Sequence, residues 1–200
     1  MRSRRGSKRC CGADGVYWAL TLRCKQKAHM GNLATGETLA LRWAEVCRDA
    51  SLRNLPYKIE LNAWGKIEMS PANNRHALLQ GTTAVELGRQ LVNGQVLTEC
   101  PVMTEIGVRV PDVAWASDAF MRISGETTPY SSAPDICVEI RSPANSDAEI
   151  AAKTKAYLAA GAQEVWVVEE SGAIRYFDAG GEKPASGFPV VISLPGPIGP

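Results

Sequence analysis

The order Ala133-Pro-Asp-Ile-Cys-Val-Glu-Ile-Arg-Ser-Pro-Ala-Asn-Ser146 places an almost continuous apolar run between two prolines. A short apolar run bounded by turn residues predicts a buried central strand over residues 135–140. Glu139 lies inside this run, where an unpaired carboxylate would be costly. We therefore expect Glu139 to be protonated, hydrogen-bonded, ion-paired or metal-bound, and Cys137 to be a small core residue.

Arg141 follows Glu139 by two residues. Because side chains alternate along a strand, this spacing predicts a carboxylate beside a cation on one face of the strand end. The pair could be a structural ion pair or part of a functional site. Taken alone, the spacing favours the structural ion pair.

A helix is expected after this strand, from a cap at Ser146 or Asp147 to Ala160. Lys153 borders the apolar face of the helix, whereas Lys155 points away from it. Lys153 could simply extend its stem along apolar surface beside an aromatic side chain. Alternatively, it could face the end of the sheet, where a lysine would activate water or stabilise the charge of a phosphoryl transition state.

The other elements follow from apolar periodicity and from turn residues. Further helices are expected over residues 35–50, from the cap Asn73–Asn74 to Gly94, and over residues 118–123. Strands or extended segments are expected at 57–61, 66–69, 96–97, 102–103, 108–110, 112–116 and 164–168, with an edge pair at 173–177 and 189–192. This order predicts a strand-rich α/β fold (α+β-like), with a mixed β-sheet flanked by helices.

Asp112 supplies a second carboxylate next to a predicted strand. Pro111 precedes it, which is typical of a bend or a strand edge because proline lacks a backbone donor. A Pro-Asp pair alone is common in turns. If Asp112 and Glu139 converge, however, their oxygens could hold a divalent cation.

Glu60 is a further candidate, at the end of a strand and just before a turn. It could be a solvated carboxylate, an added metal ligand or a residue that positions water, and Glu68 on the next strand competes with it for these roles. His76 lies near the start of the following helix. It could contact phosphate, although capping and packing are favoured slightly.

Taken together, these segments closely resemble the signature of the Uma2 family of the PD-(D/E)XK nuclease superfamily. That signature joins a Pro-Asp-led apolar strand with E-x-x-S-P, a helix with K-x-x-x-Y and a strand with G-x-x-x-x-W. The matching positions are the segment 133–146, Lys153, Tyr157, Gly161 and Val165-Trp-Val-Val168, preceded by Glu60–Gly65–Glu68–Ser70–Pro71–His76 and Gly107-Val-Arg-Val-Pro-Asp-Val113. The resemblance spans residues 36–192 in the same order.

The resemblance implies a restriction-endonuclease-like core, with Asp112 as the first acidic residue of the motif and Glu139 as the second. Arg141 stands where the superfamily has its lysine, and an arginine cannot act as a general base. In Uma2-like proteins the lysine role moves to the following helix, which here implies Lys153.

The chemistry implied is phosphodiester hydrolysis of DNA by a Mg²⁺- or Mn²⁺-dependent endonuclease. Asp112, Glu139 and the backbone carbonyl of Ile140 would hold the metal, and Glu60 would help to hold metal or water. Arg141 and His76 are the candidates for phosphate contact. The family also permits a homodimer. The alternative is a catalytically inactive module of nuclease fold that binds DNA or a protein.

Charge is distributed unevenly along the 200 residues. Residues 1–29 carry eight basic residues and one acidic residue, a net charge of +7, whereas the rest carries −6. We expect residues 1–29 to be a disordered arm or an extension from an upstream start codon, with Met30 as the natural start; a DNA-contacting arm is the alternative. Residues 30–193 would form the nuclease-like domain and 194–200 a Pro/Gly-rich tail.

Six cysteines match no zinc-binding spacing. We expect free thiols and a reducing, cytoplasmic compartment. No apolar run approaches the ~18 residues of a membrane span, so no transmembrane helix is expected.

Overall fold

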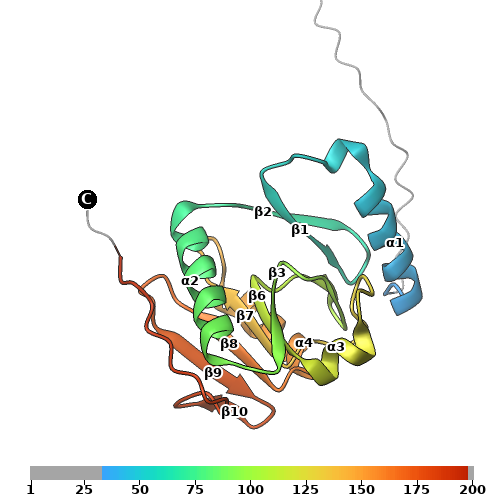
Figure 1. Ribbon diagram of the computed structural model, residues 1–200. Helices are drawn as coiled ribbons and strands as arrows, with labels where there is room; N and C mark the ends of the chain where they lie inside the picture. Colours follow the sequence, from blue (N-terminus) through green and yellow to red (C-terminus); the bar gives the residue numbers. More distant parts are fainter. Residues whose placement is uncertain (1–32, 198–200) are drawn as a thin grey trace, which may run out of the picture. The chain divides into compact units, whose positions relative to one another are not determined.

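The computed structural model describes residues 33–197, and the expectations for residues 1–29 lie outside this range. Its secondary structure consists of helices and short strands (Figure 1). In chain order they are α1 (Gly36–Arg48), the 3-10 turn η1 (Ala50–Leu52), β1 (Tyr57–Asn62), β2 (Ile67–Pro71), α2 (Asn74–Gln90), β3 (Gly94–Thr98), β4 (Val102–Thr104), β5 (Gly107–Arg109), β6 (Val113–Ser117), α3 (Asp118–Ser124), β7 (Ile136–Ile140), α4 (Asp147–Ala159), β8 (Glu164–Val168), β9 (Ile174–Asp178) and β10 (Gly181–Lys183). The predicted α/β class is confirmed.

The strands form two sheets. The larger sheet has the order β10-β9-β8-β7-β6-β3, and the smaller sheet has the order β2-β1-β5-β4. Among the strands within residues 33–197, only β7 and β8 pair in parallel, and α4 connects them; the other strand pairs are antiparallel. The larger sheet is therefore the mixed sheet that the sequence predicted. The smaller sheet was not predicted.

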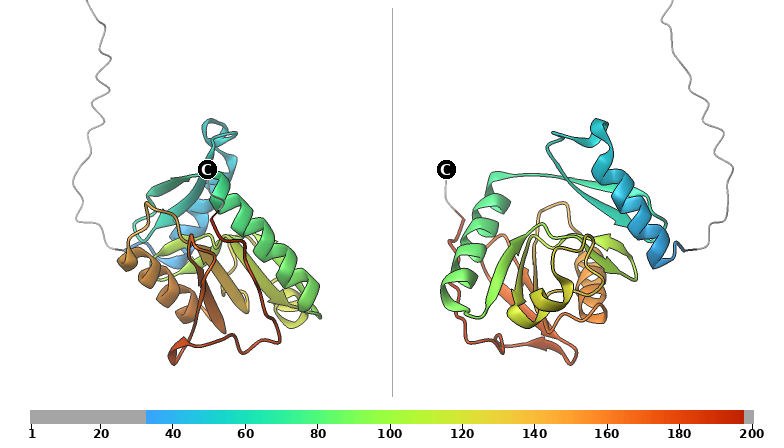
Figure 2. Two further views of the ribbon diagram at one scale, coloured as in Figure 1. Left: turned by 90° about the vertical axis from the view of Figure 1, so that its left-hand side faces the viewer. Right: turned by 45° about the vertical axis from the view of Figure 1, so that its right-hand side comes forward.

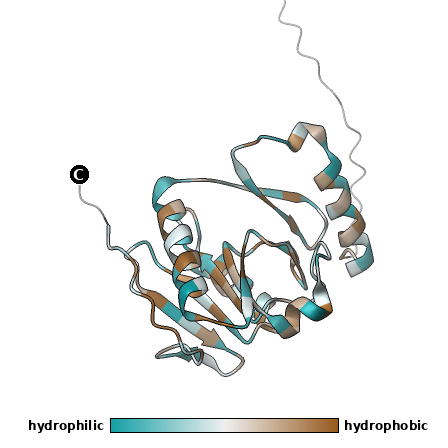
Figure 3. Ribbon diagram, in the orientation of Figure 1, coloured by the Kyte–Doolittle hydropathy of each residue, from teal (hydrophilic) through white to brown (hydrophobic). Residues whose placement is uncertain are grey.

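Helices α2 and α4 cover opposite faces of the larger sheet (Figure 2, left). Because side chains alternate along a strand, Val138 of β7 faces α2, whereas Cys137 faces α4. The buried strands β6, β7 and β8 carry mostly hydrophobic residues, which are brown in Figure 3. Alternation also places Glu139 on the α4 face, the same face as Cys137.

Local sequence signals explain where α2 and α4 begin. Asn73 caps α2 by accepting a hydrogen bond from the backbone N–H of His76 at 2.7 Å. Ser146 and Glu149 form a reciprocal capping box at the start of α4.

Two predicted element boundaries are wrong. Residues 189–192 are not a strand; the edge strand is β10, and Gln90 instead binds the backbone of Val191 through its side-chain amide. Gly94 does not end α2 but begins β3, and α2 ends at Gln90. A Cβ on Gly94 would lie 2.5 Å from the carbonyl oxygen of Ala116, so close strand packing explains the glycine.

The described part of the chain contains three free cysteines, Cys47, Cys100 and Cys137. Cys137 is fully buried in the core, as predicted. No helix within residues 33–197 is both long and apolar enough to cross a membrane.

Candidate active site

Strand register brings Asp112 next to Glu139. Val113 of β6 pairs with Val138 of β7, and the backbone N–H of Asp112 donates to the carbonyl oxygen of Val138 at 2.9 Å. Asp112 therefore lies at the end of this paired segment, close to Glu139. Both residues are almost fully buried.

The two carboxylate oxygens of Asp112 have different surroundings. Oδ2 accepts a hydrogen bond from the backbone N–H of Ile140 at 2.7 Å. Oδ1 faces cationic or basic groups: the Lys58 ammonium at 2.7 Å and His76 Nε2 at 3.2 Å. Burial alone would raise the pKa of Asp112, but Lys58 and His76 outweigh it and hold the pKa well below its usual value.

Glu139 shows the same division. Oε1 accepts a hydrogen bond from the buried Tyr157 hydroxyl at 2.7 Å. Oε2 lies 3.2 Å from the Lys153 ammonium and 3.9 Å from that of Lys58. Burial raises the pKa of Glu139, and the two lysines only partly offset this effect. Each carboxylate therefore has one oxygen fixed by a neutral donor and one oxygen exposed to cations.

Glu60 reaches the same cluster from β1. Its carboxylate accepts from the backbone N–H of Val110 at 2.8 Å and lies 2.9 Å from the Lys153 ammonium. Arg109 lies between Glu60 and Glu68, at 3.4 Å and 2.6 Å respectively. Of the two competing carboxylates, Glu60 and Glu68, it is the buried Glu60 that contacts Lys153.

Lys153 therefore bridges two carboxylates, Glu60 and Glu139. Its ammonium lies within 3.2 Å of both carboxylates, so Lys153 does more than cover apolar surface. Lys155, two residues further along α4, is exposed on another side of the helix, as predicted.

Lys58 belongs to the cluster but was not among the residues that we predicted from the sequence. Its side chain is only 14% exposed, and its ammonium lies between Asp112 and Glu139. Burial would lower its pKa, but Glu139 and Asp112 outweigh burial and raise it. The available signal was strand alternation, because Lys58 precedes Glu60 by two residues and so shares its face.

Arg141 corrects one expectation. It does not pair with Glu139; its guanidinium contacts Asp147 at the start of α4 and lies 3.7 Å from Glu169 after β8. Strands β7 and β8 are parallel and end at the same edge, which brings Arg141 close to Glu169. The two lysines take the place beside Glu139 that the E-x-R spacing had suggested for Arg141.

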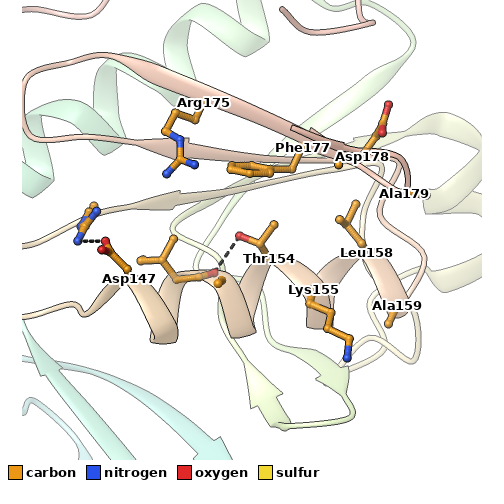
Figure 4. A pocket seen from close by; sticks show the side chains of 13 residues that line it. Asp147, Thr154, Lys155, Leu158, Ala159, Arg175, Phe177, Asp178 and Ala179 are labelled. Atoms are coloured by element: carbon orange, nitrogen blue, oxygen red, sulfur yellow. Dashed lines mark hydrogen bonds and ion pairs between the residues drawn. The ribbon is translucent and has the colours of Figure 1, made fainter. Parts of the chain in front are cut away.

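The carboxylate cluster opens into a cavity of about 260 Å³. Asp112, Glu139, Ile140, His76 and Lys153 all line it. A larger cavity of about 770 Å³ lies between α4 and β9, over the apolar side chains of Leu158 and Phe177 (Figure 4). Its lining includes Arg141 but none of the clustered carboxylates, whereas Asp112, Glu139 and Lys153 line the smaller cavity.

Comparison with known protein families gives a match over most of the chain. A family model described as "Uma2: Putative restriction endonuclease" matches residues 43–189. The chain belongs to the Uma2 family. The matched range contains every residue of the carboxylate and lysine cluster.

A solved structure supports the fold. A protein from Anabaena variabilis ATCC 29413, described as a "putative nuclease belonging to DUF820", is similar with a TM-score of 0.51 and 19% sequence identity. The similarity covers 60% of this chain and 71% of that chain. At this identity the likeness concerns the restriction-endonuclease-like fold alone. No curated protein matches the chain.

The Uma2 site has the oxygen donors that magnesium prefers. Within residues 33–197, no three or more acidic, histidine or cysteine side chains form a ready metal cage. Magnesium, however, is often held by only one or two carboxylates and completes its shell with water. Asp112 Oδ1 and Glu139 Oε2 already share one cation, the Lys58 ammonium. The residues present therefore fit a divalent cation held by these two oxygens.

Proposed function

We propose that this Uma2 protein is a metal-dependent endonuclease that hydrolyses phosphodiester bonds of DNA. One observation carries the proposal: Asp112 and Glu139 each turn one oxygen toward a shared cation position, now taken by the Lys58 ammonium, with Lys153 beside it. This combination of two carboxylates and a lysine at a sheet end is what metal-assisted phosphoryl chemistry requires.

Asp112 and Glu139 would hold the Mg²⁺ or Mn²⁺, with the backbone carbonyl of Ile140 as a further ligand. When bound, the ion would lower the pKa of a coordinated water and stabilise charge on the scissile phosphate. The protein fixes the two carboxylates beforehand, because the Ile140 N–H and the Tyr157 hydroxyl hold their other oxygens. Fixed ligands need little reorganisation during the reaction.

Lys153 would donate hydrogen bonds to the phosphate oxygens as negative charge develops there. Glu60 is better described as a positioning residue than as a metal ligand, because both of its oxygens lie within 3.0 Å of the Lys153 ammonium. His76 contacts Asp112 and lines the cavity, so it could orient Asp112 or reach a phosphate at the cavity mouth. Arg141 lies outside this cavity, and we assign it no role in hydrolysis.

The test is a cleavage assay with the purified full-length chain. Supercoiled plasmid, linear duplex, single-stranded DNA and RNA are each incubated with Mg²⁺, with Mn²⁺ or with EDTA. We expect metal-dependent cleavage of DNA that is lost in Asp112→Asn and strongly reduced in Lys153→Met. Undiminished cleavage by Asp112→Asn would refute the assignment. If the protein binds DNA but cleaves it under none of these conditions, the result would favour the alternative, a catalytically inactive binding module.

A further inference from the structure

Lys58 occupies a position that the proposed mechanism does not explain. Its side chain leaves β1 on the same face as Glu60 and ends 2.7 Å from Asp112 Oδ1 and 3.9 Å from Glu139 Oε2. These are the two oxygens that face cationic side chains, whereas the Ile140 N–H and the Tyr157 hydroxyl hold the other oxygen of each carboxylate. The ammonium therefore lies at the point where a divalent cation shared by both carboxylates would bind.

The net charge of the metal-bound cluster depends on whether Lys58 stays in place. Three carboxylates (Glu60, Asp112 and Glu139) face two ammonium groups (Lys58 and Lys153), for a net charge of −1 with His76 neutral. Adding a divalent cation while both lysines stay would give +1. Exchanging Lys58 for the cation gives zero, which is the arrangement that a buried site tolerates best.

The two lysines are held differently. Both oxygens of Glu60 lie within 3.0 Å of Lys153, in addition to its contact with Glu139. Lys58 has one short contact, to Asp112, and its side chain lines the cavity of about 260 Å³. A lysine is a compact charge on a flexible stem, so Lys58 can turn into this cavity while its backbone stays in β1.

We propose that Lys58 is a displaceable cation that holds the metal position of the metal-free protein and moves into the adjacent cavity when a divalent cation binds. This inference rests on the proposed function, because it requires a metal site at Asp112 and Glu139. Lys58 would then control how readily the site takes up metal. Only the fraction of protein with Lys58 displaced can bind the metal, and the apparent affinity is lowered by that fraction.

The first experiment measures binding of Mn²⁺ alone by titration calorimetry, with no nucleic acid present. If the displaced state of Lys58 is populated at about 10% or less, Lys58→Met should bind Mn²⁺ about tenfold more tightly than the wild-type protein. Lys66→Met is the matched control, because it removes the same charge from an exposed position in the β1–β2 hairpin. We expect Lys66→Met to bind like the wild-type protein and Asp112→Asn to lose binding.

The second experiment uses the wild-type protein and so does not depend on the folding of a variant. Lysines are acetylated with an N-hydroxysuccinimide ester, with and without saturating Mn²⁺, and quantified by peptide mass spectrometry. Displacement predicts that Mn²⁺ speeds modification of Lys58 by about tenfold, since the buried state is then depopulated. The exposed Lys155 is the internal reference and should not change.

The outcomes separate this inference from the proposed function. If the wild-type protein binds Mn²⁺ through Asp112, but Lys58→Met binds no more tightly and Lys58 labelling does not rise, the displacement model is wrong and the metal site stands. Mn²⁺ binding that appears only in Lys58→Met would support displacement in its strongest form. If Mn²⁺ binds to neither protein, both the proposed function and the inference fail.

Discussion

At the scale of single residues, the site is built from carboxylates whose two oxygens do different things. The buried Tyr157 hydroxyl holds Glu139 Oε1, and the backbone N–H of Ile140 holds Asp112 Oδ2. A carboxylate fixed in this way presents its second oxygen in a constant direction. Hydrogen-bond partners of this kind orient metal ligands, and their removal commonly weakens metal affinity or activity.

Tyr157→Phe tests this division directly. The substitution keeps the ring in the core but leaves a buried carboxylate oxygen without its donor. We expect a loss of about 1–2 kcal/mol in the free energy of unfolding by urea, and cleavage about 10- to 100-fold slower. Tyr130→Phe is the control, because that hydroxyl donates to Gly125 outside the site. Equal cleavage by both variants would show that Tyr157 does not position Glu139.

The contrast between Lys58 and Arg141 shows how far local patterns reach. Glu139 could be predicted as special because one carboxylate in an apolar strand is unusual whatever its neighbours are. Of its two cationic neighbours, Lys153 was predicted from the following helix, but Lys58 was not, because it comes from a strand 54 residues before Asp112. Arg141, the cation nearest in sequence, turns to Asp147. Strand alternation shows which face a residue shares, but not which distant element covers that face.

At the scale of elements, the close packing of β1 against β5 carries Glu60 into the site. Gly107 pairs with Asn62 and has a φ of 121°. A Cβ there would lie 2.0 Å from the carbonyl oxygen of Leu61. The glycine thus permits the register that places Glu60 against the backbone N–H of Val110.

We expect Gly107→Ala to lower the free energy of unfolding by more than about 2 kcal/mol, because both the φ angle and the contact with the backbone are incompatible with a side chain. Gly81→Ala, in the middle of α2 with open space around its Cβ, is the matched substitution. It should stabilise the protein by about 0.5–1 kcal/mol. Urea unfolding of both variants measures the difference, and a similar change in both would contradict the packing argument.

The helices and most strands could be predicted from caps and periodicity, but the division into two sheets could not. Thr35, Asn73 and Ser146 each cap a helix in the structure, and such caps are local signals. The segment around Val190 looked like a strand because it is apolar, yet it is held by Gln90 rather than by a strand partner. Sheet membership depends on long-range pairing, which short sequence patterns do not encode.

At the scale of the whole molecule, Glu164 joins the end of the chain to the central sheet. Its buried carboxylate accepts hydrogen bonds from Trp166, Ser186 and the backbone N–H of Gly187, and it pairs with Lys183. Burial would raise its pKa, but these donors outweigh burial and lower the pKa below the ordinary value of 4.5. A lowered pKa means that the ionised form stabilises the folded state.

This stabilisation should be fully present above pH 4.5 and should be lost as the pH falls through the lowered pKa of Glu164. We therefore expect Glu164→Gln to cost about 1–3 kcal/mol near neutral pH, with a smaller difference from the wild-type protein as the pH falls below 4.5. Urea unfolding of both proteins across this range measures the difference. A gap that stays constant would show that the charge of Glu164 does not contribute.

Asp112 and Glu139 are the core of the proposed metal-dependent nuclease centre. The most direct measurement is the rate of Mg²⁺-dependent plasmid cleavage by Glu139→Gln, compared with Lys155→Met on an exposed side of α4. We expect a rate at least about 100-fold below that of the wild-type protein for Glu139→Gln, and an unchanged rate for Lys155→Met. Wild-type cleavage by a correctly folded Glu139→Gln protein would contradict the proposal.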